Sequence, residues 1–436
     1  MTSHIDWLRD ELPGLQRAGV LDATAAERLR THYEAASPAA RRNWAALVIS
    51  VIGALLLGGG VILLIAHNWE ALPKAVRLAV AVGPLLVAQV LAWPALGAKA
   101  RTRPGYAEAV GGIWALVLGA AIAIVSQIYH LGGDTETFLL VWAMGVLPIV
   151  YLLDSTLAAW VALGLITGWA GVATESGRAV GYWLWLLPLA PWLGQAWRRV
   201  GTSMRAAWAI WGLAASLLVG LGCSLDRSLP GLWIVAYSGL LATLIGCDTR
   251  RDPAAVSWAR RPLAVAGGLG LIVLAMLFTF AWPWREIGWY HYRWERAEGI
   301  WPWLDAAIAV GWAAAGLAFA LKSAQRGAWL RAAYLTFPLL ATVAYGLSSV
   351  LGDHMVAAVL FNGWLFVVGL ATALAGARSA RLTLLNGGLL AAGGVVVARF
   401  FDSDMDLLAR GIAFVLLGAG LLGSNLYVMR RKGGRS

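Results

Sequence analysis

The sequence predicts an all-α fold: a polytopic transmembrane helical bundle of about fourteen spans, preceded by a short cytoplasmic N-terminal helical hairpin. Hydrophobic residues make up 60% of the 436-residue chain and charged residues only 13%, whereas soluble domains carry about 25% charged residues. Apolar runs of about 20 residues, the length that crosses a lipid bilayer, recur along most of the chain. The 25 tryptophans also suit a protein that meets the membrane–water boundary many times.

The first 42 residues are too polar to enter the membrane, and they predict a pair of cytoplasmic helices. Apolar residues recur at helical spacing in residues 5–15 and again in residues 25–33. Asp22 precedes the second of these stretches and is a suitable N-cap for it. We therefore expect residues 1–42 to form a helical hairpin that docks on the membrane domain or on a partner.

The transmembrane domain is expected over residues 43–429, followed by a basic cytoplasmic tail at 430–436. The segments at 138–153 and 181–197 are short and contain Pro148 and Pro188 with Pro191, so they could be re-entrant or broken helices, and the count could fall to twelve. The expected spans are 44–66, 75–93, 109–129, 138–153, 157–173, 181–197, 204–223, 232–247, 263–282, 301–321, 330–350, 356–375, 382–398 and 409–428.

The distribution of basic residues predicts the orientation of the chain. With the N-terminus inside, 25 of the 34 lysines and arginines fall in inner segments and 9 in outer segments. Positive residues concentrate on the cytoplasmic side of membrane proteins. We therefore expect an inner-membrane protein with both termini in the cytoplasm.

The net charge of +11 is explained by this orientation and does not predict nucleic-acid binding. Cys223 and Cys247 fall on opposite faces of the membrane in this arrangement, which argues against a disulfide between them. No cofactor-binding motif is present, so we expect no cofactor. The bilayer is the expected partner, together with a possible periplasmic or membrane protein. The sequence does not predict the oligomeric state.

Motifs of the common enzyme classes are absent, which predicts a protein that is not an enzyme. The string Gly418, Gly420 and Gly423 has dinucleotide-loop spacing, but it lies inside the last expected span and indicates helix packing. The expected spans carry almost no charge near their middles, which counts against ion-coupled transport. A permease or channel would need a water-accessible cavity lined by the polar residues Gln89, Gln127, Asn362 or Asn386.

Several outer residues suggest binding chemistry. His67, His130 and His354 each follow the outer end of an expected span near acidic residues, a combination that suits zinc or copper. The sequence favours ordinary loop positions far apart in space over a metal site. The segment from Trp282 to Trp303 mixes aromatic and charged residues, which indicates an interfacial helix or a surface that binds sugars or lipid headgroups.

Three parts of the chain carry recognisable motifs. The first combines Trp7-Leu8, AGVLD at Ala18–Asp22 and NWEALP at Asn68–Pro73. The second is SQIYHLGGD at Ser126–Asp134, followed by FLLVWAMGVLP at Phe138–Pro148. The third comprises Asn386-Gly387, RFFDSD at Arg399–Asp404 and ARGIAFVLLG at Ala409–Gly418. These parts resemble an uncharacterised family of bacterial membrane proteins, the domain-of-unknown-function family 2157. The family has no established activity, so the resemblance implies a class of protein and no mechanism.

These segments also sharpen the choice of site. The predicted binding residues are Gln127, Tyr129, His130, Asp134, Arg399, Asp402 and Arg410, all at or near the outer surface. The two arginines could instead pair with neighbouring acids in a structural role. We expect a protein that carries a ligand- or partner-binding surface on its periplasmic face. The alternative is a permease or channel-like transporter for a small polar or lipid-like solute.

Overall fold

The computed structural model is all-α over the residues that it describes, which confirms the expected fold class. Described are residues 4–36, 69–96, 104–174, 176–225, 231–248, 258–286, 300–351, 354–379 and 381–402, with the isolated residues 415, 418, 419 and 423. The chain divides into two compact units, Met1–Ala79 and Val80–Ser436, and each is considered by itself. The expected first span and the C-terminal tail lie outside the described residues, as does the expected last span apart from those four isolated residues.

The first unit contains the predicted hairpin. Its two helices, α1 (His4–Arg17) and α2 (Ala23–Ala36), pack against each other. Asp22 caps α2 as expected: its carboxylate accepts hydrogen bonds from the amide of Ala25 and the hydroxyl of Thr24. A short 3₁₀ helix, η2 (Trp69–Ala71), precedes α4.

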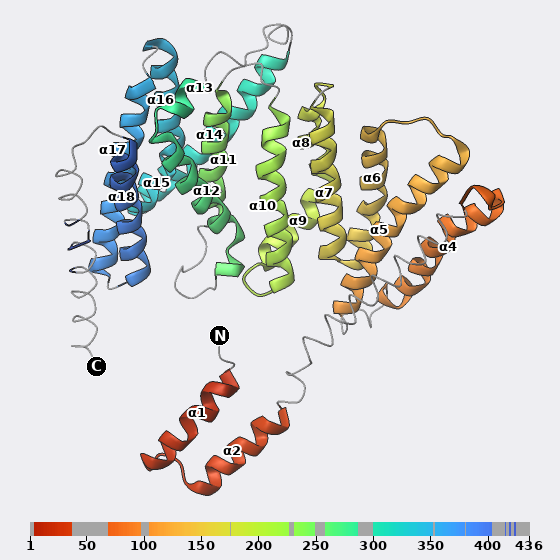
Figure 1. The fold of residues 1–436 in the computed structure, drawn as a ribbon, viewed down its shortest axis with the longest axis horizontal. Helices are drawn as coiled ribbons and strands as arrows, with labels where there is room; N and C mark the ends of the chain where they lie inside the picture. The colour runs from red at the N-terminus through yellow and green to blue at the C-terminus, as the bar shows by residue number, and fades with distance from the viewer. Residues whose placement is uncertain are drawn as a thin grey trace. The chain divides into compact units, whose positions relative to one another are not determined.

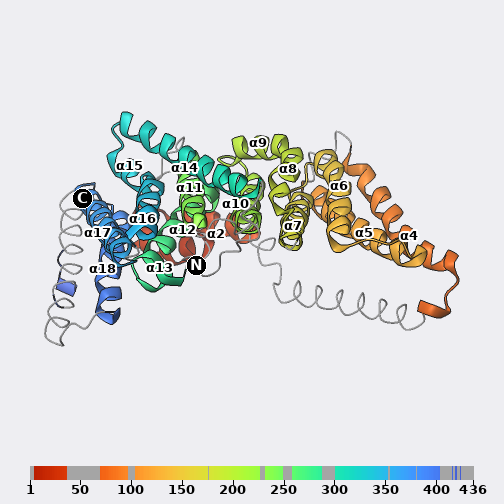
Figure 2. The same ribbon diagram turned by 90° about the horizontal axis from the view of Figure 1, so that it is seen from above.

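The second unit is a row of helices that runs from α4, α5 and α6 at one end to α17 and α18 at the other (Figures 1 and 2). Its α-helices are α4 (Lys74–Ala92), whose first turns belong to the first unit, α5 (Pro104–Tyr129), α6 (Thr135–Leu153), α7 (Thr156–Ala173), α8 (Tyr182–Leu186), α9 (Ala190–Arg199), α10 (Met204–Ser224), α11 (Leu232–Cys247), α12 (Pro262–Phe278), α13 (Trp282–Glu286), α14 (Trp301–Gln325), α15 (Trp329–Leu335), α16 (Phe337–Leu351), α17 (His354–Arg378) and α18 (Leu382–Asp402). Short 3₁₀ helices are η3 (Trp93–Ala95), η5 (Ala179–Gly181), η6 (Leu187–Leu189) and η7 (Trp258–Arg260).

Among the described residues, nine helical segments are long and apolar enough to cross a membrane, and α11 and α12 are shorter apolar helices. The expected total of about fourteen spans is therefore not confirmed. Of the two doubtful segments, the fourth is one continuous helix, α6, with Pro148 inside it. The sixth is broken into α8, η6 and α9 around Pro188 and Pro191, because a proline in a helix interior removes a backbone hydrogen bond.

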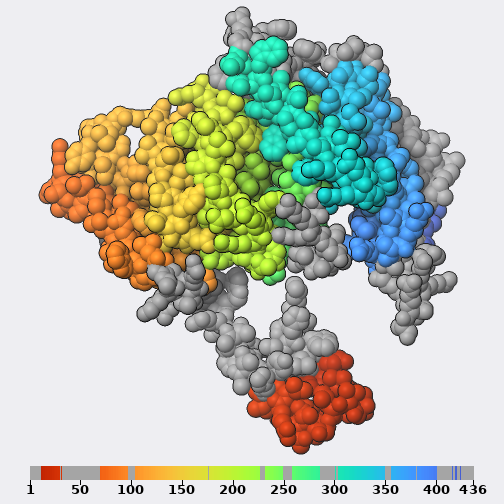
Figure 3. Space-filling model, turned by 180° about the vertical axis from the view of Figure 1, so that it is seen from behind, coloured from red at the N-terminus to blue at the C-terminus, as the bar shows by residue number. Residues whose placement is uncertain are grey.

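Small residues allow the helices of the second unit to approach closely. α11 packs against α14, and a Cβ atom added to Gly239 of α11 would collide with the backbone of α14 at Trp312 and Ala313. Figure 3, which shows the molecule from behind, has α14 and α15 in cyan on the surface. Such close contact is the usual way in which membrane helices associate.

Candidate functional site: a cavity between α4, α5 and α6

The connection between α5 and α6 is a tight turn that closes on itself. His130 follows the last residue of α5 with a left-handed φ of 52°, which reverses the chain. Its Nδ1 lies 2.9 Å from the carbonyl oxygen of Gln127. The amide of Leu131 donates to the carbonyl of Ser126 at 2.9 Å, and the Ser126 hydroxyl donates back to the carbonyl of Leu131 at 3.1 Å. Local hydrogen bonds therefore set the shape of this turn.

Asp134 ends the turn and caps α6. Its Oδ1 accepts a hydrogen bond of 2.7 Å from the amide of Thr137, which is one of the unpaired donors at the start of the helix. Hydrogen bonds from the Thr137 hydroxyl and amide hold the pKa of Asp134 below its ordinary value of 3.8. The carboxylate is therefore a fixed negative charge at neutral pH, and it is exposed to solvent.

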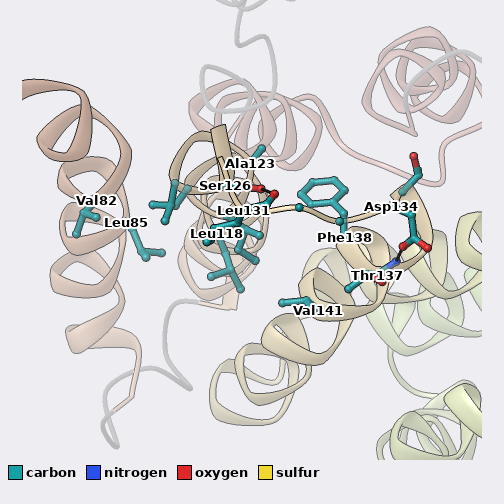
Figure 4. A pocket seen from close by; sticks show the side chains of 16 residues that line it. Val82, Leu85, Leu118, Ala123, Ser126, Leu131, Asp134, Thr137, Phe138 and Val141 are labelled. Carbon is teal, nitrogen blue, oxygen red and sulfur yellow. Dashed lines mark hydrogen bonds between the residues drawn. The ribbon is translucent and has the colours of Figure 1, made fainter. Parts of the chain in front are cut away.

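A cavity of about 640 Å³ lies beneath this turn, between α4, α5 and α6. Val82 and Leu85 form the α4 wall, opposite Leu118 of α5, and Phe138 and Val141 of α6 complete the apolar lining (Figure 4). Its polar groups are fewer, and all come from the turn and its flanks: Ser126, Asp134, Thr135 and Thr137. The cavity is thus apolar along its walls and polar at one end.

The far end of α4 is held against α5. The hydroxyl of Tyr106, in the first turn of α5, donates to the carbonyl of Leu91 in the last turn of α4 at 2.7 Å. The cavity lies further along both helices, at the end of α5 that leads into the turn. The hydrogen bond between Tyr106 and Leu91 therefore holds the two helices together at the end away from the turn, and the cavity lies between them at the end near the turn.

A second polar group flanks the turn on the other side of α6. Glu136 is buried and accepts a hydrogen bond of 2.9 Å from the Ser176 hydroxyl, and Nη2 of Arg178 lies 2.8 Å from its Oε2. This last contact is an ion pair by distance, although its geometry is not that of a hydrogen bond. Arg178 also lies within electrostatic range of Asp134. The two acids and one arginine together leave a net negative charge at this end of the cavity.

Among the predicted binding residues whose side chains the structure describes, one lines the cavity. Asp134 does so, whereas Gln127, Tyr129 and His130 are exposed on the adjacent turn and do not. Their place at the end of a long apolar helix agrees with the expectation from the sequence.

The structure does not bring Asp134 together with Arg399, the C-terminal candidate whose side chain it describes. Arg399 lies near the end of α18, at the opposite end of the row of helices from α5 and α6 (Figures 1 and 2). Its guanidinium stacks 4.9 Å from the ring centre of Phe280. Asp402 is the last residue of α18, but its side chain is not among those described, and Arg410 lies outside the described residues.

The expected metal site stays a prediction. In the described parts of the chain, no three histidine, cysteine or acidic side chains converge as metal ligands would. His67 lies outside the described residues, and the side chain of His354, the first residue of α17, is not described. The one candidate whose side chain is described, His130, has its Nδ1 against a backbone carbonyl.

Sequence reasoning missed the walls of the cavity. Val82 and Leu85 carry no signal beyond hydropathy, because nothing local distinguishes an apolar residue that faces lipid from one that faces a cavity. The segment Ser126–Asp134 was the available signal, since it places a polar turn directly after a long apolar run.

Comparison with known proteins finds one family model that covers this region. Residues 13–159 match the family model described as predicted membrane protein (DUF2157), and every residue that lines the cavity falls within that range. No curated protein and no solved structure matches the chain. The resemblance to this family expected from the sequence is therefore confirmed over residues 13–159, and the apolar helices agree with a membrane protein.

Proposed function

We propose that this protein is a non-enzymatic inner-membrane protein that binds an amphipathic molecule on its periplasmic face, in the cavity between α4, α5 and α6. The observation that carries the proposal is the division of the cavity into apolar walls and a polar end with an ionised carboxylate. Its volume lies within the range of about 300–1,000 Å³ that is common for small-molecule sites. The match of residues 13–159 supports membrane location but assigns no ligand.

The chemistry of the lining selects the class of ligand. An acyl or alkyl chain suits walls formed by Val82, Leu118 and Phe138, because it buries apolar surface there. The head of the ligand would lie beside Asp134, whose negative charge favours an ammonium group or another hydrogen-bond donor. We therefore infer a single-chain amphiphile with a cationic or donating head.

The outer surface of α4 supports access from the bilayer. Leu86, Val87 and Val90 of α4 are exposed, with Val90 71% accessible. Exposed apolar side chains on a helix of this length are suited to lipid. An amphiphile dissolved in the outer leaflet could then enter between helices without crossing water.

The transporter alternative has less support. None of the four polar residues expected in a transport pathway lines this cavity: Gln89, Gln127, Asn362 and Asn386. Asn362 instead donates to the carbonyls of Thr279 and Ala358, at 2.8 and 2.7 Å, within the packed region between α12 and α17. Binding without transport is the function that we retain.

The proposal can be tested by binding of dodecylamine to the purified full-length protein in detergent. Val141→Trp should fill the cavity and weaken binding by about tenfold or more, because the added ring occupies the space of the chain. Met144→Trp is the matched control, since Met144 is exposed on the same helix and does not line the cavity. It should bind dodecylamine as the unchanged protein does.

The charge preference gives a second measurement. Dodecylamine should bind more tightly than dodecanoate, and Asp134→Asn, which keeps a helix-capping side chain, should reduce that preference by up to about fivefold. Equal affinity for the two compounds would refute the proposed head group. Unchanged binding by Val141→Trp would refute the cavity as the site.

A further inference from the structure

Arginines gather where α11 ends and α12 begins, on the side of the helix row opposite the α5–α6 turn (Figure 1). Arg260 closes η7 and Arg261 immediately precedes α12. Arg326 follows α14, and Arg331 lies in α15, which packs against α11. We refer to Arg261, Arg326 and Arg331 as the arginine cluster. Arg260 is not part of it, because its guanidinium donates to the carbonyl of Gly201.

The carboxylate beside the cluster, that of Asp248, already forms an ion pair. Asp248 pairs with Arg261 through a contact of 2.8 Å between its Oδ2 and Nε of the arginine, and both side chains are largely buried. Arg331 instead donates from Nη2 to the carbonyl of Ile245 at 2.6 Å. The Nε of Arg331 is buried and has no hydrogen-bond partner among the described residues. Arg331 is therefore a partly buried charge whose neighbouring carboxylate, that of Asp248, is already paired with Arg261.

The cluster has a surplus of positive charge in a partly buried place. Arg331 is within electrostatic range of Arg261 and Arg326 as well as of Asp248. Among the described residues, the three arginines of the cluster therefore share one carboxylate, that of Asp248. Repulsion between like charges is stronger where protein and lipid exclude water. An anion that binds here would therefore be stabilised by several guanidinium groups at once.

Two exposed tryptophans place the cluster at the depth of lipid headgroups. Trp258 is 69% accessible and stacks edge-on against Trp211, with ring centres 6.4 Å apart. Trp329, two residues before Arg331, is 71% accessible. Exposed indole rings beside arginines at the ends of apolar helices are typical of the membrane–water boundary.

We propose that the arginine cluster binds the phosphate group of an anionic phospholipid. Guanidinium groups donate paired hydrogen bonds to phosphate oxygens, and basic pockets between membrane helices on the cytoplasmic side are suited to lipid headgroups. The acyl chains of the lipid would lie along the apolar helices, which a free phosphate ion cannot use. The site is separate from the cavity at the α5–α6 turn and does not depend on it.

The test uses the full-length protein in detergent, with dioleoylphosphatidylglycerol as the probe and native mass spectrometry to count bound lipid. The unchanged protein should retain phosphatidylglycerol in preference to phosphatidylcholine. Arg331→Gln should reduce retention of phosphatidylglycerol by about fivefold, the effect expected for one arginine near a lipid surface. Arg198→Gln, which removes an exposed charge from the last turn of α9, is the matched control and should leave retention unchanged.

A second variant keeps the test decisive if Arg331→Gln does not fold. Arg326 is exposed, so Arg326→Gln should lower phosphatidylglycerol retention in the same direction without changing the thermal unfolding temperature. Equal retention of the two lipids, or equal effects of the cluster variants and Arg198→Gln, would overturn the proposal. Displacement of the bound lipid by millimolar inorganic phosphate would also overturn it, because the site would then recognise the free anion.

Discussion

Glu108 is the acceptor at the centre of a polar contact that joins three helices. Its carboxylate, on α5, accepts hydrogen bonds from the amides of Thr156 and Leu157 at 3.0 and 2.9 Å and from the Ser155 hydroxyl at 3.0 Å. The Nε of Arg205, on α10, lies 2.6 Å from the same carboxylate. A negative charge at the first turn of α7 compensates the unpaired amides of that helix. Glu108 therefore links α5, α7 and α10 through one side chain.

This arrangement predicts that Glu108 and Arg205 are energetically coupled. Glu108→Gln should lower the free energy of unfolding by about 2 kcal/mol, because buried donors lose their charged acceptor. Arg205→Gln should cost less, since the arginine is more exposed. The double variant should lose about 1 kcal/mol less free energy of unfolding than the sum of the losses in the two single variants. Unfolding in mixed detergent micelles measures all four proteins, and strictly additive losses would refute the coupling.

At the scale of elements, α17 and α18 form an antiparallel pair in which glycines set the separation. A Cβ atom on Gly388 would collide with the backbone of Gly369 and Ala373, and one on Gly376 would collide with Leu385. A Cβ atom added to the adjacent Gly387 would have no neighbour within 4 Å. The high glycine content predicts close packing in general, but only the rotation of each helix decides which glycines are needed.

The two adjacent glycines provide a matched test. Gly388→Ala should lower the free energy of unfolding by about 1–3 kcal/mol, because the added methyl group forces the helices apart. Gly387→Ala should be neutral or stabilise by up to about 1 kcal/mol, since alanine is the better helix former. Thermal unfolding in detergent compares the two variants. Equal destabilisation by both would show that the separation of α17 and α18 is not set at Gly388.

At the scale of the whole molecule, we propose the orientation that the charge distribution predicts. Successive long helices run in alternate directions. The α5–α6 turn and the end of α9 therefore lie on opposite sides of the row of helices (Figure 1). The predicted outer positions include His130 and Asp134, and the predicted inner positions include Arg198 and the arginine cluster. The orientation assigns the cavity to the periplasmic side and the proposed lipid site to the cytoplasmic side.

Labelling of single cysteines tests this orientation. In a protein with Cys223 and Cys247 replaced by serine, Gly132→Cys should react with a membrane-impermeant maleimide in intact spheroplasts. Arg198→Cys should react only after the membrane is permeabilised. Both positions are exposed, so a difference in labelling reports the side of the membrane. The opposite pattern would reverse the orientation and move the cavity to the cytoplasmic side.

The sequence by itself determined the features that depend on neighbouring residues or on composition. The excess of apolar residues predicted membrane-spanning helices, because backbone groups in lipid must form their hydrogen bonds within a helix or a closed barrel. Asp22 was identified as a cap, and the polar turn at Ser126–Asp134 as the end of a span, because both signals lie within a few residues. The break around Pro188 was anticipated for the same reason, since proline acts on its own turn.

Only the tertiary structure decided how distant residues meet. It placed Val82 across a cavity from Leu118, and it placed Asp134 and Arg399 at opposite ends of the helix row although both follow apolar spans. It also joined Arg331 to the end of α11 and Glu108 to Arg205. Hydropathy reports that a helix is apolar but not how it is rotated or which helix lies beside it. Those choices follow from side-chain packing between segments far apart in the chain.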